Sequence, residues 1–193
     1  MESLKLDIQN FFQTVIAEYP EQMLFKPDHK FHDRTTGQHM LDVASAGSAI
    51  SMEINNPIGA SAVLLATLVH DIGKLKALKE TGKMFNHEKI GAEMIRNMPR
   101  ISITPYTEEE QKVLNLVAEL VLGHGYRMNA LQVAAAKARK YMEERALAGG
   151  VDVAEFFFLL EQVMLADKFG FSSEGQAQAD TEIAELKKKV LDS

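Results

Sequence analysis

The chain has 193 residues, of which 46% are apolar and 25% charged, a composition that suits one compact soluble domain with a real core. It contains no cysteine, which excludes disulfides, thiolate zinc sites and cysteine nucleophiles. The net charge of -6 argues against a broad nucleic-acid-binding surface, because such a surface needs a concentrated positive field.

The N-terminal segment lacks the basic start and the apolar run of a signal peptide. The longest mainly apolar stretch, residues 60–69, is too short to span a bilayer. A cytoplasmic location without a membrane partner is therefore expected, and there is no strong evidence for a nucleic-acid partner. The oligomeric state is not readable from the sequence.

Apolar residues recur at steps of three and four along most of the chain, which is typical of amphipathic helices. In chain order, helices are expected at residues 4–19, 36–52, 58–72, 86–97, 107–122, 131–147 and 152–169, with a last one around residues 183–190. Two capping boxes, Thr107 with Glu110 and Asp152 with Glu155, mark the starts of two of them. Residues 21–35, 74–84 and 172–180 are expected to be loops. No strand alternation, repeat or long linker is visible, so the predicted fold class is all-α in a single domain.

The strongest local signal is the string His70-Asp71-Ile72-Gly73-Lys74, which directly follows an apolar run that should be deeply buried. An unpaired buried carboxylate is costly, and a divalent cation would neutralise it while accepting an imidazole lone pair. Successive helix residues diverge by about 100°, so both side chains serve one metal best near a helix end, which Gly73 supplies. The alternative is a His-Asp pair that simply reaches solvent at a helix terminus.

Asp167 is the second anomaly, because it occupies the apolar stripe of its own predicted helix, after Phe156, Leu160 and Val163. Alone it could reach water or pair with a basic residue, but other ligand-type residues that need a carboxylate favour metal binding. Three histidines, none diagnostic alone, complete the set of candidates: His39, His87 and His124. His29 and His32 lie in a polar loop and are expected at the surface.

Taken together, the order His39, His70-Asp71, His87, His124 and Asp167 resembles the HD superfamily of metal-dependent phosphohydrolases, whose most recognisable motif is HDIGK. The segment FNHEKIGAEMI is similar to the HD domains of bacterial tRNA nucleotidyltransferases. The resemblance implies a single compact multi-helix HD domain over residues 1–193, with a metal-binding core at about 36–169 and flanking N- and C-terminal helices. These 193 residues show neither the catalytic domain of the nucleotidyltransferases nor the GYP signature of cyclic-di-GMP phosphodiesterases.

The resemblance also implies a buried metal site between helices. Four residues would bind one metal: His39, His70, Asp71 and Asp167. In relatives with two metals, the equivalents of His87 and His124 bind the second ion and the equivalent of Asp71 bridges the two. Mixed imidazole and carboxylate ligands suit manganese, iron, nickel, cobalt or zinc better than calcium, and magnesium is less natural. One or two divalent transition-metal ions are therefore the expected cofactor.

The predicted activity is hydrolysis of a phosphate ester by metal-activated water, since a divalent ion lowers the pKa of its water and polarises a phosphoryl oxygen. The expected substrate is a small phosphorylated molecule, namely a nucleotide phosphomonoester or phosphodiester. Asp71 and Lys74 are the predicted catalytic residues. Lys74, by the resemblance, and Arg127, three residues after His124, are the predicted contacts to the substrate phosphate. The alternative for Lys74 is a solvated lysine in a basic loop.

Two other functions remain compatible with the sequence. Some HD relatives hold two irons and use dioxygen to oxidise a small organic substrate, and a six-residue site allows that chemistry. A non-catalytic, metal-stabilised interaction module is the third alternative, although an intact ligand set argues against it.

Overall fold

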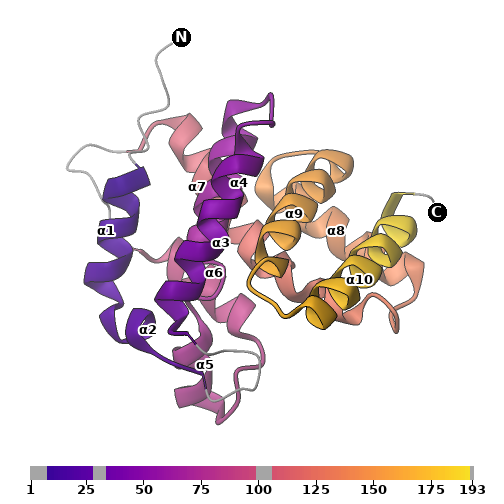
Figure 1. Ribbon diagram of the computed structural model, residues 1–193. Coiled ribbons are helices and arrows are strands. Elements are labelled where there is room, and N and C mark those ends of the chain that lie inside the picture. The colour runs from indigo at the N-terminus through magenta and orange to yellow at the C-terminus, as the bar shows by residue number, and fades with distance from the viewer. Residues whose placement is uncertain (1–7, 28–33, 99–105, 192–193) are drawn as a thin grey trace.

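A computed structural model describes residues 8–27, 34–98 and 106–191, and every regular element in these ranges is helical (Figure 1). The elements follow in this order: α1 (Ile8–Glu18), α2 (Pro20–Leu24), α3 (Thr36–Ser51), α4 (Pro57–Val69), α5 (Lys74–Thr81), α6 (His87–Arg96), α7 (Glu108–Gly123), the 3-10 helix η1 (His124–Asn129), α8 (Ala135–Gly149), α9 (Val153–Lys168) and α10 (Ser173–Leu191). The predicted all-α class is therefore confirmed. His29 and His32 lie outside the described residues.

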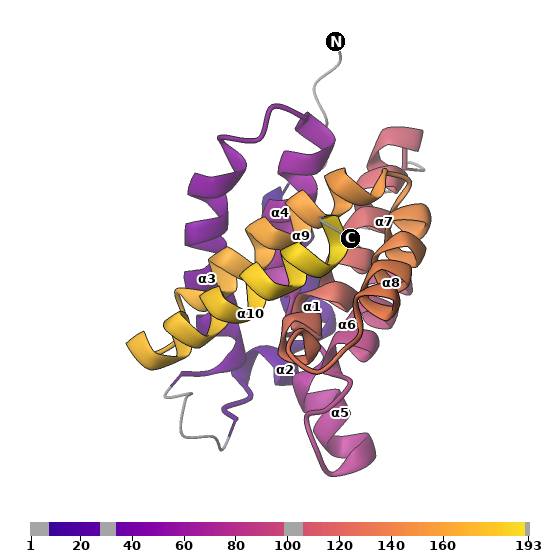
Figure 2. The same ribbon diagram turned by 90° about the vertical axis from the view of Figure 1, so that its right-hand side faces the viewer.

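Helix α4 lies at the centre of the fold because it is apolar on nearly all sides, the pattern of a helix that is buried all round. It packs against α3, α7 and α9. Figures 1 and 2 show α1 and α2 on one side of this helix, and α8, α9 and α10 on the other. One cluster of buried apolar side chains extends from Phe11 in α1 to Val190 in α10. Among the described residues, no single helix is long and apolar enough to cross a membrane.

Side-chain caps fix where several helices begin. Thr107 forms the expected capping box, accepting from the backbone N–H of Glu110 while its own backbone N–H donates to the Glu110 carboxylate. Asp152 caps α9 by accepting from the backbone N–H of Glu155 at 2.8 Å. The capping box also predicted a hydrogen bond from the Asp152 backbone N–H to the Glu155 carboxylate. That carboxylate instead accepts from Asn56 Nδ2 at 2.6 Å, which links α9 to the start of α4.

The structure corrects several predicted boundaries. Residues 74–81 form helix α5 and residues 20–24 form α2, where loops were expected. The α5 sequence has little apolar content, but lysine, leucine, alanine and glutamate are strong helix formers, and Gly82 ends the helix with a positive φ of 72°. α10 begins at Ser173, although residues 172–180 were expected to form a loop. The first half of this helix is polar, and its buried side chains start only at Ala179. The helix before the HD pair ends at Val69, and α8 begins at Ala135 rather than at residue 131.

Gly73 allows the turn after α4 to lie directly against α6. A Cβ at this position would meet the carbonyl oxygen of His87 at 2.2 Å and the backbone nitrogen of Gly91 at 2.7 Å. Both neighbours are backbone atoms, which cannot move aside as a flexible side chain can. The contact sets the distance between the HD turn and the start of α6, which both carry predicted ligands.

We therefore expect Gly73→Ala to lower the free energy of unfolding by about 1–3 kcal/mol, the usual cost of forcing a methyl group into a packed contact. Urea denaturation measures the change. Gly91→Ala is the matched control, because a Cβ there would make ordinary contacts at 3.4 Å with Ile72 and Val121. Equal stabilities of the two variants would contradict the close-contact explanation.

Candidate metal centre

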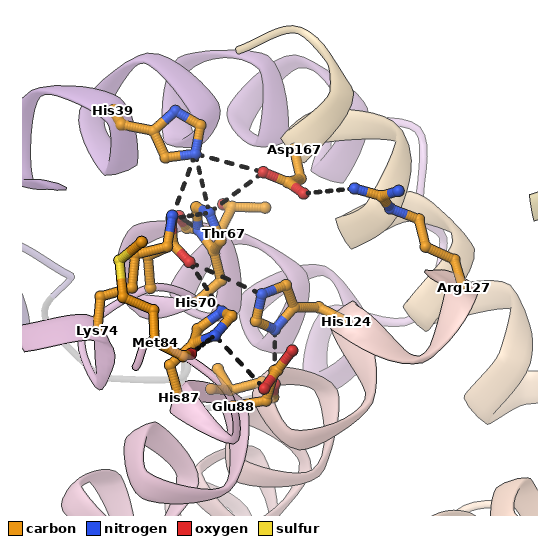
Figure 3. A network of polar contacts seen from close by, with 12 residues as sticks. His39, Thr67, His70, Lys74, Met84, His87, Glu88, His124, Arg127 and Asp167 are labelled. Atoms are coloured by element: carbon orange, nitrogen blue, oxygen red, sulfur yellow. Dashed lines mark hydrogen bonds and ion pairs between the residues drawn. The ribbon is translucent and has the colours of Figure 1, made fainter. Parts of the chain in front are cut away.

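Six side chains from five separate stretches of the chain converge at one place in the fold (Figure 3). His39 comes from α3, His70 and Asp71 from the turn after α4, His87 from the start of α6, His124 from the start of η1, and Asp167 from the end of α9. Five of them are buried, and the side chain of His87 is 13% exposed. Within the described part of the chain, these six form two groups arranged as metal ligands: His39, His70 and Asp167, and Asp71, His87 and His124.

In the first group, three donor atoms face one another at nearly equal distances. Asp167 Oδ1 lies 3.3 Å from His39 Nε2 and 3.3 Å from His70 Nε2. The two imidazole nitrogens are themselves 3.3 Å apart. Two imidazole nitrogens and a carboxylate oxygen around a common point make a donor set that transition-metal ions prefer.

Asp71 belongs to the second group but presents one oxygen to the imidazoles of each group. Its Oδ2 is 3.4 Å from His39 Nε2 and 3.3 Å from His70 Nε2. Its Oδ1 is 3.2 Å from His87 Nε2 and 3.9 Å from His124 Nε2. A carboxylate placed in this way can bridge two cations, which is the arrangement that the sequence resemblance implied.

Backbone carbonyls on the far side orient three of the imidazoles. The Nδ1 atoms of His70, His87 and His124 lie 3.0, 2.9 and 2.7 Å from the carbonyl oxygens of Thr67, Met84 and Val121. A carbonyl only accepts, so each Nδ1 carries the proton. In the neutral form of such an imidazole the lone pair is on Nε2, and the Nε2 atoms of all three rings point into the centre. The residues present therefore fit a divalent metal ion.

Burial and neighbouring charges shift the pKa values of several groups in the centre. Burial alone would raise the pKa of Asp71, but the nearby Lys74 and His70 keep that pKa well below its ordinary value. Burial likewise opposes the charged form of His70, yet Asp71 and Asp167 raise its pKa to about 10. Burial, together with the charges of His70 and His87, lowers the pKa of His124 to about 4.

These shifts predict that cation binding to the metal-free protein releases protons. Because the pKa of His70 is raised to about 10, its imidazole is protonated at pH 7 and must lose the Nε2 proton before it can bind a metal. The two carboxylates, whose pKa values are low, release none. We expect the affinity for Mn²⁺ or Ni²⁺ to rise with pH from 6 to 9. Calorimetry in buffers of different ionisation enthalpy measures the released protons, and a pH-independent affinity would contradict this assignment.

The two predicted phosphate contacts lie beside the centre, each on a different carboxylate. Lys74 Nζ is 2.5 Å from Asp71 Oδ2, and the lysine side chain is 11% exposed. Arg127 Nη2 is 3.6 Å from Asp167 Oδ2. Neither side chain is a solvated surface residue, since both are almost buried. Their roles toward a substrate stay predictions.

Glu88 contacts a candidate ligand, although the sequence did not mark it as a site residue. Its Oε2 lies 3.4 Å from His87 Nδ1, and its side chain passes over Gly125, where a Cβ would meet Glu88 Oε1 at 2.0 Å. The available signal was the glycine after His124, which allows a close approach. Nothing in the sequence indicated which side chain makes that approach.

A family model of the HD domain matches residues 36–169. The chain belongs to the HD domain family. No curated protein and no solved structure matches it. The matched segment starts at the first residue of α3 and ends one residue after α9, so it contains all six converging side chains. Members of this family are in general metal-dependent phosphohydrolases, and the buried imidazoles and carboxylates of this chain fit a metal site.

Proposed function

We propose that this HD domain hydrolyses a phosphate ester of a small substrate, with nucleotide phosphomonoesters and phosphodiesters as the expected class. The observation that carries the proposal is the position of Asp71, which faces both groups of candidate ligands and also contacts a lysine ammonium. A divalent ion bound there supplies a water of lowered pKa and polarises a phosphoryl oxygen. One or two ions of manganese, iron, nickel, cobalt or zinc suit the donor set.

The chain's own residues have separate roles in this proposal. Asp71 holds the negative charge that attracts the cation and orients the imidazoles on either side of it. Lys74 begins α5 directly after the HD turn, so its ammonium lies at the edge of the centre. A phosphate oxygen that approaches the centre would replace part of the contact between Lys74 and Asp71. Hydrogen bonds from a lysine to an anionic phosphate are charge-assisted and therefore strong.

Asp71→Ala should abolish both metal binding and hydrolysis, because it removes a carboxylate that faces the imidazoles of both groups. Metal content after dialysis and turnover of phosphodiesters, nucleoside monophosphates and nucleoside triphosphates with added Mn²⁺ or Ni²⁺ are measured together. Asp42→Ala, on the exposed side of α3, is the control and should keep both properties. Full hydrolysis by Asp71→Ala would contradict the proposal.

The same preparations separate hydrolysis from an oxygenase reaction and from a non-catalytic module. Anaerobically purified protein is analysed for iron and then tested for oxygen uptake with organic substrates. Asp71-dependent oxygen uptake without phosphate release would support a di-iron oxygenase instead. Metal binding without any turnover across the screen would support a metal-stabilised interaction module.

Lys74→Met should leave metal binding intact but lower kcat/KM for the best phosphate ester by about 10²–10³-fold, the usual effect of losing one group that stabilises developing negative charge. Methionine keeps most of the buried stem and removes only the ammonium. Lys76→Met is the matched control, because the Lys76 side chain is 46% exposed on the same helix. An unchanged kcat/KM for Lys74→Met would remove Lys74 from the reaction.

A further inference from the structure

A chain of buried charged groups connects α10 to the metal centre. Glu182 Oε2 accepts a hydrogen bond from Arg127 Nη1 at 2.6 Å, and Arg127 Nη2 lies 3.6 Å from Asp167 Oδ2. The three side chains are 5%, 11% and 8% exposed. Gln178 Nε2 donates to the other oxygen of Glu182 at 2.8 Å, so both carboxylate oxygens of Glu182 have partners.

Asp167 divides its two oxygens between the metal centre and the arginine. Oδ1 faces the Nε2 atoms of His39 and His70, while Oδ2 faces Arg127 (Figure 3). A carboxylate bound on one side only by two imidazoles could rotate about its Cβ–Cγ bond. The arginine on the opposite side removes that freedom and keeps Oδ1 directed at the centre.

Arg127 is itself held on several sides. It lies in η1, three residues after His124, so the short helix that carries a ligand of the second group also carries the arginine that holds a ligand of the first. Its guanidinium carbon lies 5.1 Å from the centre of the Phe171 ring, which covers one face of the group. Glu182 accepts from Nη1 of Arg127 and balances the charge of the guanidinium.

We propose that Glu182, through Arg127, is a positioning residue for Asp167, so that α10 completes the metal centre from outside the segment that matches the HD domain. The proposal rests on the metal-binding part of the proposed function and does not require a particular substrate. Groups that orient metal ligands in this way usually change metal affinity or activity about 10–100-fold when they are removed.

The geometry favours this role over direct binding of a substrate phosphate by Arg127. Both terminal nitrogens of the guanidinium face carboxylates, one on Asp167 and one on Glu182. An arginine free to clamp a phosphate would present the two nitrogens together to the anion. The test below distinguishes this positioning role from direct binding of the substrate by Arg127.

The test compares Glu182→Gln and Arg127→Lys with the unaltered chain. We expect both to weaken Mn²⁺ or Co²⁺ binding about tenfold or more, measured by chelator competition without substrate, and to change the visible absorption spectrum of the Co²⁺-loaded protein. The double variant should be no worse than the poorer single variant, because both changes break one chain of contacts. Glu174→Gln, an exposed position on the same helix, should change nothing.

Several results would overturn the proposal. One is an unchanged metal affinity and cobalt spectrum in both variants, even if their unfolding midpoints fall, since that pattern describes a purely structural contact. Another is weaker inhibition by inorganic phosphate and a higher KM in Arg127→Lys at constant metal affinity, which would make Arg127 a substrate contact. A chain that binds no divalent ion would overturn it as well.

Circular dichroism checks that each variant folds, and if Glu182→Gln does not, Arg127→Lys, which keeps the charge, carries the test alone. Weaker metal binding in the variants of a chain that hydrolyses no phosphate ester would uphold this inference while the proposed function fails.

Discussion

The structure depends on the burial of the Asp71 carboxylate beside a second carboxylate, Asp167, in the interior of a helical protein. Ionised carboxylates resist transfer from water into such surroundings unless positive charge or strong donors lie next to them. Here four imidazoles, Lys74 and Arg127 surround the pair. The fold is arranged so that these groups reach the carboxylates from different directions.

Local sequence features and tertiary contacts contribute to that arrangement in different ways. The apolar helix α4 buries the HD turn, and the carbonyl at the last turn of α4 fixes the ring of His70 through its Nδ1. Two glycines then allow unusually close contacts around the centre. Gly73 lies against the start of α6, and Gly170 lies against the ring of His39, where a Cβ would meet Cε1 at 2.4 Å.

Much of the centre was predictable, because its residues are types that are rarely buried without a partner. Asp167 in an apolar stripe and the HD pair after an apolar run are both recognisable in the sequence, and all three residues are buried in the structure. The other candidate ligands, His39, His87 and His124, were identified by their order along the chain, which resembles that of the HD family. The start of α7 was likewise predictable, since Thr107 and Glu110 cap it through local hydrogen bonds.

The parts that were missed depend on contacts between distant segments or on weak periodicity. The sequence of α5 looks like a basic loop because it has little apolar periodicity. Only two of its residues, Lys74 and Ala77, are buried, so the helix needs no apolar stripe. Glu182 looks like one more charged residue on a polar helix, and only the packing of α10 against η1 shows that it faces Arg127. Charge patterns along one helix do not reveal such partners.

The most direct test of the central claim is anomalous diffraction from crystals grown with Mn²⁺. We expect a peak within coordination distance of Asp71, bound also by His39, His70 and Asp167, and, where two ions bind, a second peak beside His87 and His124. Manganese bound elsewhere, with these six side chains contacting only one another, would contradict the account.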